Sequence, residues 1–81
     1  MPDHILGWVD IVIEQYLALP SNQQRLIDTR IQQLLTDPAG SDTHRDPDTD
    51  LWTTTDAAGS GLIVYIFRAD KPRLVIMRLV Y

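Results

Sequence analysis

The chain has 81 residues, of which 44% are hydrophobic, and its formal net charge is −4. This length fits one domain over residues 1–81, which buries about 60% of the surface of its unfolded chain. The absence of cysteine excludes disulfides, thiolate metal sites and a cysteine nucleophile. No apolar run reaches the roughly 20 residues that a membrane helix needs, so we expect a soluble protein of the cytoplasm.

The charges are unevenly placed along the chain. Residues 1–50 contain nine acidic and three basic side chains, whereas residues 51–81 contain two acidic and four basic ones. An acidic protein has no overall field that attracts nucleic acid, because phosphate binding needs cations. A nucleic-acid role therefore depends on four basic residues: Arg68, Lys71, Arg73 and Arg78. The alternative is that these cations only keep a pair of strands soluble.

The first predicted element is a short strand over residues 3–8. Gly7 weakens a helix and Trp8 suits the face of a sheet, which favours this interpretation over the alternative of a continuous helix. Asp10 then caps a helix that runs to about Leu19.

A second helix is predicted from Ser21. Ser21 and Gln24 have the spacing of a capping box, in which each residue bonds to the backbone of the other. Asp37-Pro38 ends this helix, because proline disfavours helical geometry in the residue before it. The helix carries an apolar stripe at helical spacing, which consists of Ile27, Ile31, Leu34 and Leu35.

Residues 37–50 are rich in Asp, Pro, Ser, Thr and Gly, and this composition predicts a loop. Residues 51–55 then read as a strand, because Trp and Thr are both favoured there. Asp46, Asp48 and Asp50 copy the first three ligand positions of a calcium loop. The rest of that motif is missing, so solvated carboxylates are the preferred interpretation and no metal is expected.

Two apolar runs, residues 62–67 and 74–81, are joined by a polar segment and predict a β-hairpin. Neither run alternates apolar with polar residues, so both strands should be central in their sheet. The predicted order is β-α-α-β-β-β. This order gives an α+β fold in which a helical hairpin packs on one face of an antiparallel sheet.

Two single residues raise questions about function. Trp52 could stack on a base or a partner side chain, or pack in the core. Strict alternation places Arg78 on the same face as Leu74, Ile76 and Val80. Burying a lone guanidinium is costly, so that face must open to water or supply a partner.

Four short motifs are spread along the chain: Leu19-Pro20 before the second helix, Asp37-Pro38 after it, Leu51-Trp52 at the next strand and Val64-Tyr65-Ile66-Phe67 in the strand after that. Together they resemble the RelE/ParE superfamily of toxins from bacterial type II toxin–antitoxin systems. The resemblance implies a curved antiparallel sheet with two helices packed on one face. It also implies either ribosome-dependent mRNA cleavage or inhibition of DNA gyrase, without a cofactor and with a cognate antitoxin as partner.

Two positions differ from the patterns of the RNA-cleaving members. Thr55 stands where HigB-like proteins have a basic residue after Leu-Trp, and Leu62 stands where RelE-like proteins have an arginine. RNA cleavage depends on cations that stabilise charge on the phosphate. The leading hypothesis is therefore a toxin-like protein that binds a protein target and is neutralised by an antitoxin.

Two alternatives stay open. One is a ribonuclease with a rearranged site, in which Arg73 or Arg78 stabilises the phosphorane charge and Tyr81 or His44 transfers the proton. The other is a non-toxic member of the fold that forms a homodimer. Further candidate residues are Arg68 for catalysis and three for binding, namely Arg45, Trp52 and Lys71.

Overall fold

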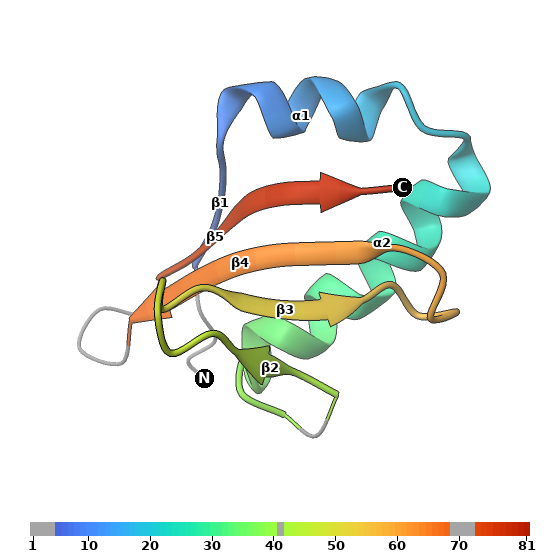
Figure 1. Cartoon of the computed structure of the whole chain (residues 1–81). Helices are drawn as coiled ribbons and strands as arrows, with labels where there is room; N and C mark the ends of the chain where they lie inside the picture. Colours follow the sequence, from blue (N-terminus) through green and yellow to red (C-terminus); the bar gives the residue numbers. More distant parts are fainter. Residues whose placement is uncertain (1–4, 41, 69–72) are drawn as a thin grey trace.

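The two most apolar segments of the chain form strands β4 (Leu62–Arg68) and β5 (Arg73–Val80) in the computed structural model (Figure 1). The structure describes residues 5–40, 42–68 and 73–81. The sheet has the strand order β1-β5-β4-β3-β2, and β4 pairs with β5 in antiparallel fashion. Both apolar strands are therefore interior strands, which confirms the prediction from their composition.

A short hairpin extends the sheet on the far side of β4. Strand β3 (Trp52–Thr55) pairs with β4, and β2 (His44–Arg45) pairs with β3, both antiparallel. The amide of Asp46 donates to the carbonyl of Leu51 at 2.8 Å and closes this hairpin. The prediction of a loop throughout residues 37–50 is therefore wrong for the two residues of β2.

The first strand, β1 (Ile5–Trp8), lies at the opposite edge and pairs with β5 in parallel. The predicted strand is confirmed, but the prediction of an antiparallel sheet is wrong because the sheet is mixed. Strands joined by a tight turn must run antiparallel. β1 and β5 are separated by most of the chain, so no such turn constrains them.

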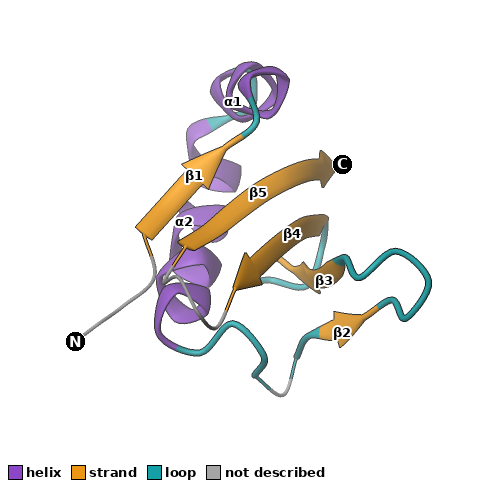
Figure 2. Cartoon of the chain, turned by 90° about the vertical axis from the view of Figure 1, so that its left-hand side faces the viewer, coloured by secondary structure: helices purple, strands orange, loops and turns teal. Residues whose placement is uncertain are grey.

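Helix α2 (Ser21–Thr36) crosses one face of the sheet and lies behind the strands in Figure 1. Helix α1 (Asp10–Leu17) lies beside β5 where β1 has ended, and ends two residues before the predicted boundary. Figure 2 shows α1 end-on at the edge of the sheet. No helix in the described ranges is long and apolar enough to cross a membrane.

Both predicted helix caps are wrong. The N-caps are Val9 and Pro20, and neither makes a side-chain capping bond. The Gln24 side chain instead donates from Nε2 to the backbone carbonyls of Tyr16 and Leu19. Gln24 therefore holds the end of α1 against the beginning of α2.

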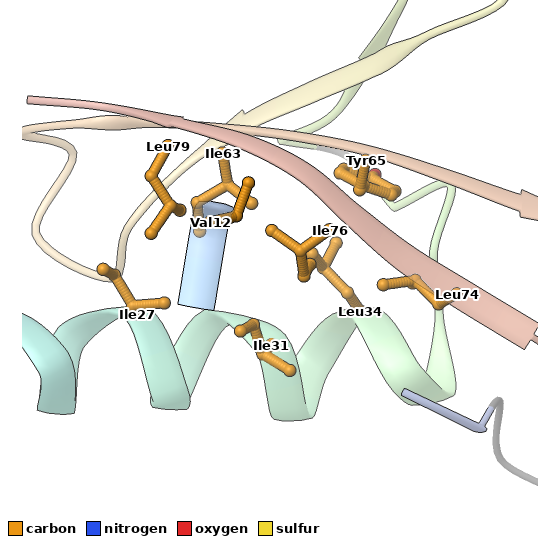
Figure 3. Close-up of a cluster of buried hydrophobic side chains, with 9 residues drawn as sticks. All are labelled: Val12, Ile27, Ile31, Leu34, Ile63, Tyr65, Leu74, Ile76 and Leu79. Carbon is orange, nitrogen blue, oxygen red and sulfur yellow. The ribbon is translucent and has the colours of Figure 1, made fainter. Parts of the chain in front are cut away.

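The core lies between α2 and the sheet, and one residue of α1 completes it (Figure 3). Three of the four residues in the predicted stripe of α2 are buried, and Leu35 is half-buried. Burial of each such side chain contributes on the order of 1.5–3 kcal/mol. The core residues are Val12, Ile27, Ile31, Leu34, Ile63, Tyr65, Leu74, Ile76 and Leu79.

Candidate binding surface

The side of the sheet that faces away from α2, here called the open face, holds most of the predicted site residues. Alternate residues of a strand point to opposite faces, and residues paired across strands share a face. Because Ile63 and Tyr65 point into the core, their neighbours in β4 point away from it. On β4 and β5 the open face consists of Leu62, Val64, Ile66, Arg68, Arg73, Val75, Arg78 and Val80.

Three arginines lie on the open face. Arg68 and Arg73 are direct cross-strand partners, whereas Arg78 pairs with Val64. Val64, and with it Arg78, lies about 13 Å from Arg68 along β4, because each residue of a strand advances about 3.3 Å. Arg73 also lies near β1, since its Nε is 3.9 Å from the position of a Cβ added to Gly7.

A β-bulge at Met77 determines where Arg78 points. Tyr65 pairs with Ile76 and Val64 pairs with Arg78, so Met77 is an extra residue in β5. The prediction that Arg78 shares a face with Leu74 and Ile76 is therefore wrong. The bulge moves Arg78 to the open face, where it is exposed, and Leu79 takes the following core position.

The sheet is positively charged although the protein is acidic. Four arginines lie in the strands, and none of the five strands contains Asp or Glu. The acidic residues of the described chain belong to the helices and the connecting segments. The open face therefore combines cations with apolar side chains and is suited to a partner that is both anionic and apolar.

His44 lies at the far edge of the same face. Its register partner is Thr53, which pairs with Val64 and through it with Arg78. Three strand spacings separate His44 from Arg78, which is about 14 Å.

Tyr81 is held by a buried carboxylate. Its hydroxyl donates to Oδ2 of Asp56 at 2.7 Å, and its ring covers Gly61. Burial and the bonded Asp56 carboxylate raise the pKa of the Tyr81 hydroxyl. Tyr81 and Arg78 do line one groove beside α1, of about 390 Å³. Even so, the hydroxyl is engaged with Asp56 and poorly suited to transfer a proton at neutral pH.

Asp56 is fully buried and accepts four hydrogen bonds. Burial alone would raise the pKa of its carboxyl group. The amides of Ala58 and Ser60 and the hydroxyls of Ser60 and Tyr81 outweigh that effect and lower the pKa to about 2. Asp56 is thus an ionised structural group that organises the turn between β3 and β4.

Two of the predicted binding residues lie on the side of the core. Trp52 pairs with Tyr65 and contacts the ring of Phe67, with ring centroids 5.1 Å apart. It packs against the core, which favours packing over stacking on a ligand. Arg45 pairs with Trp52 and forms an ion pair with Asp50 at 2.6 Å.

The acidic loop before β3 does not form a metal site in the structure. One Asp46 oxygen accepts the amide of Asp48, and Asp50 is bonded to Arg45. Among the described residues, no three histidine or carboxylate side chains gather around a common point. Lys71, the remaining predicted binding residue, lies outside the described residues.

The comparisons with known proteins do not assign a family. No protein-family model, no curated protein and no solved structure matches the chain.

Sequence reasoning missed the cluster of Asp56, Gly61 and Tyr81. Asp56 follows a strand and precedes Ala57-Ala58-Gly59, a pattern typical of a simple turn. The one available signal is Asp56 itself, because an aspartate in a turn can accept hydrogen bonds from the backbone amides two and four residues later. Its bond to Tyr81, 25 residues away, depends on the register of β4 and β5.

Proposed function

We propose that this chain is a toxin-like protein of the RelE/ParE kind, which acts by binding a protein target through the open face. A cognate antitoxin would neutralise it by binding. The supporting observation is the composition of the open face, where the described residues of β4 and β5 combine exposed arginines with apolar residues and include no Asp or Glu. The order of two helices followed by an antiparallel β3-β4-β5 sheet also agrees with the fold that the resemblance implies.

A purely binding role fits the open face better than catalysis does. Proton transfer needs a titratable group within hydrogen-bonding reach of the reacting atom. The hydroxyl of Tyr81 is bonded to Asp56, and the backbones of His44 and Arg78 lie about 14 Å apart, three strand spacings. The described residues of β4 and β5 on the open face are arginines and aliphatic residues, which are suited to recognition rather than to bond cleavage.

The proposed place of action is the bacterial cytoplasm. The chain contains no cysteine, which is consistent with a reducing compartment. Gyrase is one protein target of the kind that the resemblance implies, and the ribosome with its mRNA is the target of the rival hypothesis.

The ribonuclease hypothesis remains the second candidate, and the spacing of the arginines favours it. Arg73 and Arg78 could each contact a phosphate of one strand, since they lie about 13 Å apart along the sheet. The remaining candidate is a non-toxic homodimer that has kept only the fold.

The test is a growth curve after tightly controlled induction in a bacterial host, with protein synthesis followed by amino-acid incorporation. Wild type is compared with Arg78→Ala and with Arg25→Ala, a matched control on the exposed side of α2. We expect growth arrest with protein synthesis at first intact, weakened by Arg78→Ala and unchanged by Arg25→Ala.

Other outcomes of this test would contradict the proposal. An immediate block of translation, with cleavage of ribosome-bound mRNA that Arg78→Ala relieves, would establish the ribonuclease instead. Normal growth under strong expression would exclude a toxin and leave the non-toxic binding fold.

A further inference from the structure

Helix α1 presents apolar and acidic side chains to solvent. Ile13 is 39% exposed and Leu17 is 68% exposed. Asp10 and Glu14 are exposed as well, and the helix contains no lysine or arginine. Such exposed aliphatic residues on a helix indicate a surface that contacts a partner.

These four residues share one side of the helix. Ile13 and Leu17 are four residues apart, as are Asp10 and Glu14, so each pair forms a row along the axis. Each residue turns the helix by 100°, so the two rows lie side by side on its surface. Val12 lies on a different side of the helix and points into the core. Asp10, Ile13, Glu14 and Leu17 are here called the outer face of α1.

A hollow borders the outer face and enlarges its apolar area. It measures about 340 Å³ and is lined by Trp8, Ile13, Tyr16 and Leu17. The rings of Trp8 and Tyr16 contact each other at 5.2 Å between centroids. An aliphatic side chain from another molecule would find aromatic and aliphatic walls there.

The open face of the sheet has the complementary character. It places Arg68, Arg73 and Arg78 among aliphatic side chains, and its strands contain no carboxylate. The outer face of α1 has carboxylates among aliphatic side chains and contains no cation. Each surface thus offers the charge that the other one lacks.

We infer that the outer face of α1 of one molecule docks on the open face of a second copy of the same chain. The carboxylates of Asp10 and Glu14 face the arginines, and the leucine and isoleucine side chains pack on Val64, Ile66 and Val75. A contact between two open faces is disfavoured, because it would bring the arginines of both copies together.

This contact is heterologous, since it joins two different surfaces. The pair of copies keeps one free open face and one free outer face, so assembly continues to short chains or closes into a ring. Only about two turns of helix contribute, which places the contact among small and transient interfaces. We expect a dissociation constant on the order of 100 µM.

Self-association of this kind would cover the open face. If the proposed function is correct, a target and a second copy compete for the same arginines. Association can be measured on the purified chain alone, so its failure would leave the proposed function untouched.

The test is sedimentation velocity of the purified chain from about 10 µM to about 1 mM. We expect the average mass to rise with concentration, and to fall towards the monomer at about 0.5 M salt because the charges are exposed. Glu14→Arg and Arg73→Glu should each weaken association by about tenfold. Arg25→Glu, an equal change of charge on the exposed side of α2, should have no effect.

Charge exchange distinguishes this contact from a symmetric dimer. The double variant Glu14→Arg with Arg73→Glu should associate again, since the exchanged charges meet in the contact. An equimolar mixture of the two single variants should associate beyond the heterodimer, because the outer face of each variant meets an open face of opposite charge on the other, whereas a symmetric contact would stop at pairs. A wild type that is monomeric at about 1 mM would overturn the inference. Association that does not depend on salt concentration would overturn it as well. The same holds for a double variant that is folded by circular dichroism but stays monomeric.

Discussion

The hydroxyl of Tyr81 donates a 2.7 Å hydrogen bond to the fully buried carboxylate of Asp56. This bond joins the residue after β5 to the turn between β3 and β4. The tyrosine ring also covers Gly61 at the beginning of β4. Three segments of the sheet are thereby held together at the end opposite to the Arg68–Arg73 pair.

Removal of this bond should destabilise the fold. Tyr81→Phe keeps the ring over Gly61 but deletes one of four donors to a buried carboxylate. We expect a loss of about 1–3 kcal/mol in the free energy of unfolding, measured by urea denaturation. A variant as stable as the wild type would show that the bond contributes nothing. If Tyr81 has only this structural role, the growth arrest proposed above should persist at temperatures where the variant is folded.

Gly61 is required because the tyrosine ring lies directly over it. A Cβ added to Gly61 would lie 2.3 Å from a ring carbon of Tyr81, so the ring must move. We expect Gly61→Ala to cost about 1–3 kcal/mol, chiefly through the lost Asp56 bond. A double-mutant cycle checks this, since Gly61→Ala should cost less in a Tyr81→Ala background. Equal costs in both backgrounds would contradict the contact.

Asp56 should make stability depend on acid pH. Its carboxyl pKa is lowered from 3.8 to about 2 in the folded protein, so the folded state binds the proton less tightly than the unfolded state. The ionised group therefore contributes about 2 kcal/mol above pH 4, and this contribution disappears as the pH falls through about 2. Urea denaturation of wild type and Asp56→Asn should show a stability difference that shrinks over this range. A difference that is the same at pH 7 and pH 2 would contradict the lowered pKa.

The sequence predicted those elements that local patterns determine. The stripe containing Ile27 and Ile31 follows the period of a helix, and the apolar runs of β4 and β5 follow from burial on both sides. The bulge at Met77 could not be predicted, because one extra residue does not change the hydrophobic pattern of a strand that is apolar on both faces. The position of Arg78 depends on that bulge, so alternation placed it on the wrong face.

Contacts between distant segments account for the rest. The parallel pairing of β1 with β5 depends on the path of the chain through both helices, which no local motif encodes. The role of Asp56 depends on Tyr81 in the same way. By contrast, the sequence alone identified the arginines of the candidate surface, because a cation within an otherwise apolar strand needs either solvent or a partner.

Arg78 should matter for binding and not for folding. Its side chain is exposed on the open face, which points away from the core. We expect Arg78→Ala to change the free energy of unfolding by less than about 0.5 kcal/mol, because exposed substitutions are usually that mild. Thermal denaturation checks this expectation. A larger loss would mean that Arg78 stabilises the bulge, and its effect on growth would then need a milder variant such as Arg78→Gln.

Trp52 should show the opposite behaviour. Its ring lies on the side of the core against Tyr65 and Phe67, so its removal leaves a cavity beside the buried tyrosine. We expect Trp52→Ala to cost about 2–4 kcal/mol, somewhat less than a fully buried tryptophan because the residue is half-buried. Trp52→Phe should recover most of this loss, since a smaller ring still packs on Phe67. If Trp52→Ala left stability unchanged but abolished the proposed growth arrest, the ring would be a binding residue, and the candidate surface would have to include β3.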